Sequence, residues 1–117
     1  METERRKYTK QLYLKKVGTG VEYIDDNLVK TGETIRLTCI ACENETTGLT
    51  YMRFGKVTAG YFHLWEEQKN PAAGELVYTT EEHWVWEDEH FRCAVSGGAA
   101  NDIIRVYLDG YYVKGSE

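Results

Sequence analysis

Apolar and polar residues alternate with a period of two along most of this chain, and no long stretch repeats apolar residues at the spacing of a helix. Two segments, 33–41 and 89–96, show the alternation best, and each has a cysteine on its predicted inward face. The residues predicted to point inward are Ile35, Leu37, Cys39 and Ala41 in the first segment and Phe91, Cys93 and Val95 in the second. Such a chain is expected to form sheets with one buried face.

Turn-forming residues separate the alternating segments at intervals of about 8 to 12 residues, the spacing typical of β-sandwiches. The predicted turns include Gly55-Lys56 and Asp109-Gly110, of which the second is a strong hairpin signal. The predicted inward residues of the strand before that turn are Ile104, Val106 and Leu108. We therefore expect an all-β fold, an antiparallel β-sandwich with about seven to nine short strands. A length of 117 residues suits one domain.

The net charge of -5 is unevenly distributed. Residues 1–16 contain six basic and two acidic side chains, a net +4, which leaves -9 on the remainder. We predict that residues 1–7 form a basic N-terminal arm and that residues 8–117 form the sandwich domain. Residues 75–90 hold six acids and no Lys or Arg. Both charge runs can be simply solvated, or the arm of one copy can contact the acidic segment of the next, which would build a homo-oligomer.

Several function classes are not expected from the sequence. No apolar run is long enough for a membrane span, no signal peptide is visible, and a pI of about 5.2 argues against nucleic-acid binding. The histidines His63, His83 and His90 stand in no nucleophile or metallohydrolase pattern. We therefore expect no enzyme, no catalytic residue and no cofactor.

The two cysteine segments carry a resemblance to a known family. Residues 32–39 resemble the second core strand of immunoglobulin-like domains, and residues 88–96 resemble the sixth. The turn at Gly97-Gly98 and the strand that ends at Leu108 resemble the closing hairpin of that family. The resemblance implies an immunoglobulin-like sandwich in which Cys39 and Cys93 form a structural pair, either bonded or packed together.

The third cysteine leaves an alternative open. Residues 39–42 form a C-x-x-C motif and residues 90–93 an H-x-x-C motif, so Cys39, Cys42, His90 and Cys93 make a set that a tetrahedral zinc site would use. A straight strand places residues three apart on opposite faces, which argues against this convergence. We therefore predict no metal site and keep a small zinc-binding domain as the alternative.

Aromatic residues are abundant, and several are predicted to serve an interface. Trp and Tyr are the residues that most often anchor protein interfaces, and a short terminal strand with an open edge invites pairing with another chain. The predicted binding residues are Arg5, Arg6, Lys7, Trp84, Trp86, Tyr107, Tyr111 and Tyr112.

The expected function is that of a non-enzymatic structural or binding protein. The class that we favour is a virion accessory protein, such as a capsid decoration or cement protein of a phage, which binds a major capsid protein or further copies of itself. The alternative is an extracellular recognition or adhesion module of immunoglobulin-like type. The glycosylation sequon Asn44-Glu45-Thr46 supports that alternative.

Overall fold

The computed structural model describes the backbone of residues 3–115 and the side chains of residues 6–113. This part of the chain forms nine strands. The strands are β1 (Thr3–Lys15), β2 (Glu22–Asp25), β3 (Thr34–Asn44), β4 (Leu49–Thr58), β5 (Tyr61–Lys69), β6 (Val77–Thr79), β7 (His83–Val85), β8 (His90–Gly97) and β9 (Ile103–Gly115). Within residues 3–115 no helix has the length and apolarity needed to cross a membrane.

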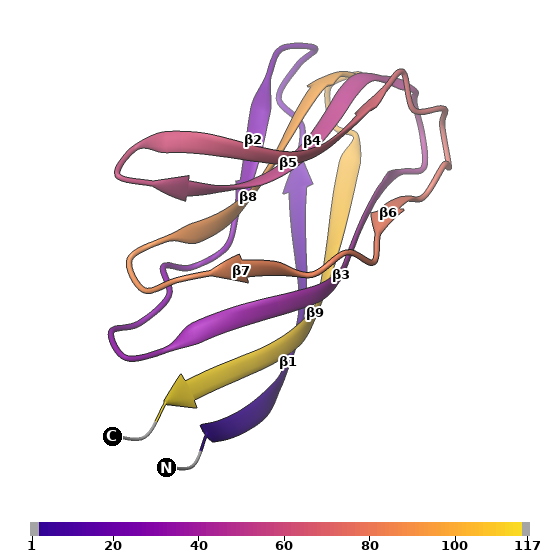
Figure 1. Ribbon diagram of the computed structural model, residues 1–117. Helices are drawn as coiled ribbons and strands as arrows, with labels where there is room; N and C mark the ends of the chain where they lie inside the picture. The colour runs from indigo at the N-terminus through magenta and orange to yellow at the C-terminus, as the bar shows by residue number, and fades with distance from the viewer. Residues whose placement is uncertain (1–2, 116–117) are drawn as a thin grey trace.

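The strands form two antiparallel sheets that pack face to face (Figure 1). Sheet 1 has the order β1-β9-β3-β6, and β7 pairs with β3 on the same edge as β6. Sheet 2 has the order β2-β8-β4-β5. The predicted all-β antiparallel sandwich is therefore confirmed. The predicted closing hairpin is wrong, because β8 lies in sheet 2 whereas β9 lies in sheet 1 between β1 and β3.

The core lies between the sheets and receives side chains from both. Sheet 1 contributes Ile35, Leu37, Ile40, Val85, Ile104, Val106 and Leu108, and sheet 2 contributes Ile24, Met52, Phe54, Phe91, Cys93 and Val95. The inward residues predicted for the strands now called β8 and β9 are confirmed. Removing this apolar area from water provides the main force that holds the sheets together.

A β-bulge interrupts the alternation of β3. Leu37 pairs with Gly110 and Cys39 pairs with Asp109, so β3 advances by two residues where β9 advances by one. Beyond the bulge, the side chains that point inward are those of Ile40 and Cys42, which are fully buried. A one-residue shift moves every later side chain to the other face. The prediction that Cys39 and Ala41 point inward is therefore wrong.

Two glycines that were predicted to form turns lie inside strands. A Cβ on Gly110 would stand 2.0 Å from the carbonyl oxygen of Arg36, and one on Gly55 would stand 2.1 Å from that of His63. Each glycine lies beside a register shift, where two backbones approach closely. The chain reverses instead at Ala59-Gly60, after β4.

The N-terminal residues belong to the sandwich. Strand β1 pairs with β9 along its whole length, from Thr3 opposite Gly115 to Lys15 opposite Ile103. The predicted boundary between an arm, residues 1–7, and the domain therefore falls inside β1. Residues 1 and 2 lie outside the described part of the chain.

The bulge predicts that Gly110 cannot carry a side chain. In G110A the new methyl group would collide with the Arg36 carbonyl, and relief requires β3 and β9 to separate locally. We expect a loss of about 2 kcal/mol or more in the free energy of unfolding, measured by urea denaturation. In the control G18A the methyl group meets no atom within 4 Å, and a change of less than about 1 kcal/mol is expected. Equal stability of the two variants would contradict the close approach.

Candidate functional site

The outer surface of sheet 1 collects aromatic side chains from three strands, β6, β7 and β9, and from Trp86, which follows β7. Residues that pair across neighbouring strands point to the same side of a sheet. One such row consists of Lys7, Tyr111, Arg36 and Trp84, and a second consists of Gln11, Tyr107, Ala41 and Tyr78. We call the side chains of Tyr78, Trp84, Trp86, Tyr107 and Tyr111 the aromatic face.

Four of the five residues of the aromatic face are exposed and Tyr111 is half-buried; the rings also contact neighbouring side chains. Trp86 follows β7, and its ring stacks on that of Trp84 with a centroid distance of 5.6 Å and an interplanar angle of 13°. Tyr78 and Trp86 are 65% and 52% exposed. Ala41, between Tyr107 and Tyr78, is 8% exposed even though it points outward. The two tyrosines and the short alanine side chain therefore form one continuous surface.

Polar groups hold this surface in place. The Arg36 guanidinium makes two hydrogen bonds to the Glu82 carboxylate and lies 5.8 Å from the ring centroid of Trp84. The Tyr107 hydroxyl donates to Glu43 Oε1 at 3.0 Å. A bidentate arginine beside an aromatic ring presents a flat, ordered group. The face thus combines ring surfaces with oriented hydrogen-bonding groups.

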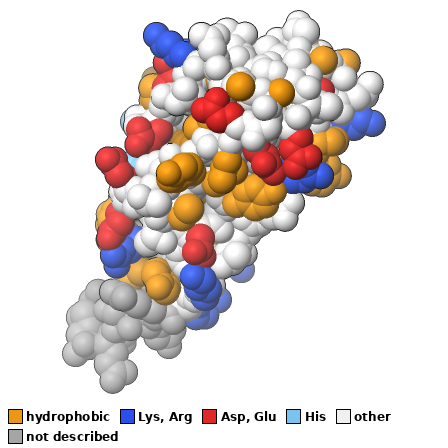
Figure 2. Space-filling view, turned by 90° about the vertical axis from the view of Figure 1, so that its right-hand side faces the viewer, with side chains coloured by type: hydrophobic (Ala, Val, Ile, Leu, Met, Phe, Trp, Pro, Cys, Tyr) orange, Lys and Arg blue, Asp and Glu red, His pale blue; other side chains and the backbone are white. Residues whose placement is uncertain are grey.

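Apolar side chains also gather on the side of the molecule where β6 lies. Figure 2 shows them near the centre of this view, with acidic and basic side chains around them. This arrangement, an apolar centre with a charged rim, is the usual anatomy of a protein interface.

The structure brings together some of the predicted binding residues and separates others. Lys7, Trp84, Trp86, Tyr107 and Tyr111 lie on or beside the aromatic face. The sequence analysis missed Tyr78, because a strand as short as β6 shows too little alternation to indicate which side faces outward.

Arg6 and Tyr112 lie on the opposite side of sheet 1 from the aromatic face. The ring of Tyr112 packs edge-on against Tyr8 at 5.0 Å, and the Arg6 guanidinium lies 4.4 Å from the Tyr112 centroid. The side chain of Arg5 lies outside the described residues. The expectation that a short terminal strand with an open edge follows the Asp109-Gly110 turn is wrong, because residues 111–113 continue β9, which is covered by β1 on one side and by β3 on the other.

Most of the basic side chains that the structure describes in residues 6–16 are compensated within the chain. Four basic side chains form ion pairs there: Arg6 with Glu33, Lys7 with Asp109, Lys10 with Asp26 and Lys16 with Glu22. The side chain of Lys16 has no exposed surface, and its ammonium donates to Gly20 O and Glu22 Oε2, both at 2.9 Å. The contact that we predicted between a basic arm and the next copy would therefore have to compete with these pairs.

Cys93 packs against Cys42, not against Cys39. The Cys93 thiol donates to Cys42 Sγ at 3.8 Å, and both residues have no exposed surface. The predicted pair of Cys39 with Cys93 is wrong, because the β3 bulge places Cys42 inward and leaves Cys39 on the outer side. All three thiols are free. Burial, together with the hydrogen bond to Cys42, raises the pKa of Cys93, so this thiol stays protonated.

The four residues of the alternative zinc site do not come together. Cys39 lies on the outer side of sheet 1, while Cys42 and Cys93 lie between the sheets. His90 lies on the outer side of sheet 2, where its Nε2 is 3.5 Å from Asp25 Oδ2. These positions place the potential ligands on three different surfaces.

The aromatic face offers the chemistry of a binding surface, with large rigid rings and few flexible groups. Comparison of the chain with protein-family models, with curated proteins and with solved structures finds no match. The interpretation of the site therefore depends on its own geometry.

The cysteine arrangement predicts one reactive thiol. Cys39 should react with a maleimide in the folded protein. Cys42 and Cys93 should react at least about tenfold more slowly, since opening of the fold must first expose them. The measurement is mass spectrometry of labelled protein over time. C39S should lose the fast phase, and C42S should keep it. A fast phase that persists in C39S would contradict the assignment.

The ion pair between the buried Lys16 and the half-buried Glu22 predicts a dependence of stability on pH. The hydrogen bond from Lys16, with those from the amides of Val17 and Gly18, lowers the pKa of Glu22 below its ordinary value of 4.5. The stabilisation is therefore complete above that value and is lost as the pH falls through the lower pKa of the folded state. In E22Q the Lys16 ammonium loses its charged partner and keeps Gly20 O, and we expect a loss of about 2 kcal/mol at neutral pH.

Urea denaturation at several pH values measures this effect. The stability of E22Q should decline less steeply in acid than that of the unsubstituted protein, because the titrating carboxylate is gone. The control E87Q changes an exposed acid and should follow the unsubstituted protein. A slope for E22Q identical to that of the unsubstituted protein would exclude this pair as a source of acid sensitivity.

Proposed function

We propose that this chain is a non-enzymatic binding protein that docks on a partner protein through the aromatic face. The observation that carries the proposal is the alignment of Tyr and Trp side chains in two rows of one sheet, with Arg36 between them. Interfaces are enriched in these three residue types, which bury much area at little cost in side-chain entropy.

The proposed docking site is the face of sheet 1, not the strand edge that was expected after Asp109-Gly110. Residues 111–113 belong to an interior strand, so the backbone groups expected there for strand addition already pair with β1 and β3. The partner therefore has to offer side chains or a surface that fits over aromatic rings. An apolar patch with acidic groups near Arg36 is the complement expected for this surface.

We further propose that this binding protein is an accessory protein of a virus particle. It stays a prediction from the sequence, and detection of the chain among the proteins of purified virus particles would test it. The immunoglobulin-like extracellular module remains the second candidate, and the two-sheet architecture is compatible with it. Its sequon lends it little support, because Asn44 is 2% exposed and its side-chain amide donates to Asp102 Oδ2 at 3.0 Å.

The docking proposal is tested by substituting the most exposed rings of the aromatic face. In the double variant Tyr78→Ser with Trp86→Ser the fold should persist, since both rings are more than half exposed. Full-length tagged chain, cross-linked in its native source, should capture one protein in stoichiometric amount. We expect at least about tenfold less of that protein with the double variant, because interface anchors each contribute more than about 1 kcal/mol.

A matched control uses two exposed tyrosines of sheet 2. Tyr23 and Tyr61 are 53% and 73% exposed, and Tyr23→Ser with Tyr61→Ser should leave capture unchanged. Sedimentation velocity of the purified chain identifies the case in which the partner is a second copy. Equal capture by both double variants, or loss with the sheet 2 variant alone, would overturn the proposal.

A further inference from the structure

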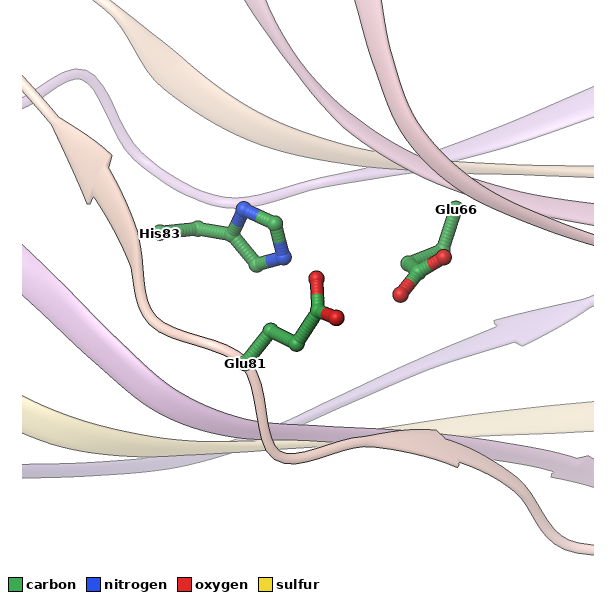
Figure 3. A group of neighbouring side chains, drawn as sticks. All are labelled: Glu66, Glu81 and His83. Carbon is green, nitrogen blue, oxygen red and sulfur yellow. The ribbon is translucent and has the colours of Figure 1, made fainter.

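Three potential metal ligands converge where an edge of sheet 1 meets an edge of sheet 2. Glu66 lies on β5, His83 begins β7, and Glu81 lies in the loop that precedes β7. One ligand atom from each side chain lies within 4.8 Å of the other two. Figure 3 shows the imidazole of His83 directed toward the two carboxylates.

The imidazole of His83 is held in position but lacks a hydrogen-bond partner. Its ring stacks on Trp65 with a centroid distance of 4.3 Å and an interplanar angle of 8°. Its Nε2 atom is buried and makes no hydrogen bond to any described residue. A buried imidazole nitrogen without a hydrogen-bond partner is available to ligate a metal.

The two carboxylates are also oriented, and their charge is not compensated by a basic side chain. The Thr79 hydroxyl donates to Glu66 Oε1 at 3.2 Å and accepts the backbone N–H of Glu81, also at 3.2 Å. Among the described residues, neither Glu66 nor Glu81 forms an ion pair with Lys or Arg. Two carboxylates this close repel each other unless a cation or a proton lies between them.

We propose that Glu66, Glu81 and His83 form a binding site for a divalent transition-metal cation of the zinc class. An imidazole nitrogen with two carboxylate oxygens is a donor set suited to Zn²⁺, and a water molecule would complete a tetrahedron. Ca²⁺ and Mg²⁺ fit less well, because they prefer six or more oxygen ligands. Thr79 and Trp65 act as positioning residues, since they orient the ligands without contacting the metal.

The bound cation would join the two sheets. Glu66 pairs with Phe54 in sheet 2, and His83 pairs with Leu37 in sheet 1. Phe54 and Leu37 both belong to the core, so Glu66 and His83 point toward the space between the sheets. Strands β5 and β7 are each at the edge of a sheet. A metal held by ligands from both edges would close this side of the sandwich and stabilise it.

Zinc binding to chelator-treated full-length chain tests the site. We expect about one zinc ion per chain, measured by competition with a chromophoric chelator, and a rise of about 5 °C in Tm at saturating zinc. Glu66→Gln preserves the hydrogen bond from Thr79, and His83→Phe preserves the stacking on Trp65. Each should weaken zinc binding at least about tenfold and reduce the rise in Tm. If His83→Phe fails to fold, Glu66→Gln carries the test.

The controls separate this site from other zinc ligands on the chain. His63→Gln removes an exposed histidine of β5, and Cys39→Ser removes the thiol outside the core; neither should change zinc affinity. Co²⁺ should give the visible d–d bands of tetrahedral nitrogen and oxygen ligands, without thiolate charge-transfer bands. The proposal is overturned if zinc does not bind, if His83→Phe and Glu66→Gln bind as the unsubstituted chain does, if a control abolishes binding, or if Ca²⁺ binds as tightly. The carboxylates of Glu66 and Glu81 would then serve only to protect the edges of the two sheets from pairing with strands of another chain.

Discussion

The bulge in β3 opposite Gly110 is the constraint on which the rest of sheet 1 depends. It inserts one residue before Cys39 and thereby decides which side chains of the following segment enter the core. Cys42 then meets Cys93 across the sandwich. Ala41 turns outward, where its small side chain leaves room for the tyrosines beside it. The buried cysteine contact and the aromatic face are thus two results of one irregularity.

The strands whose alternation of apolar and polar residues is uninterrupted were predicted correctly from the sequence. The inward faces of β8 and β9 agree with the pattern because neither strand gains or loses a residue along its length. The errors concentrate at Gly110 and Gly55. Glycine serves both in turns, where a positive φ is needed, and at close approaches of two backbones. Local sequence does not distinguish these uses, since the approaching backbone belongs to a distant segment.

The candidate sites were predictable only in part, for a related reason. Composition indicated that aromatic residues serve an interface, but the row that joins Lys7, Tyr111, Arg36 and Trp84 depends on cross-strand register between distant segments. The same holds for Glu66 and His83, which come from different sheets. Charge patterning suggested a free basic arm, because the acidic partners of Arg6 and Lys7 could not be identified without that register.

The two proposed sites meet in β7, which is three residues long. His83 points toward the carboxylates between the sheets, and its neighbour Trp84 points outward into the aromatic face. Successive side chains of a strand lie on opposite faces, so the backbone that places one places the other. A strand this short is held mainly by its contacts with β3 and by the groups at its ends. A cation that linked His83 to β5 would therefore also order Trp84 and Trp86, the rings that the partner is proposed to bind.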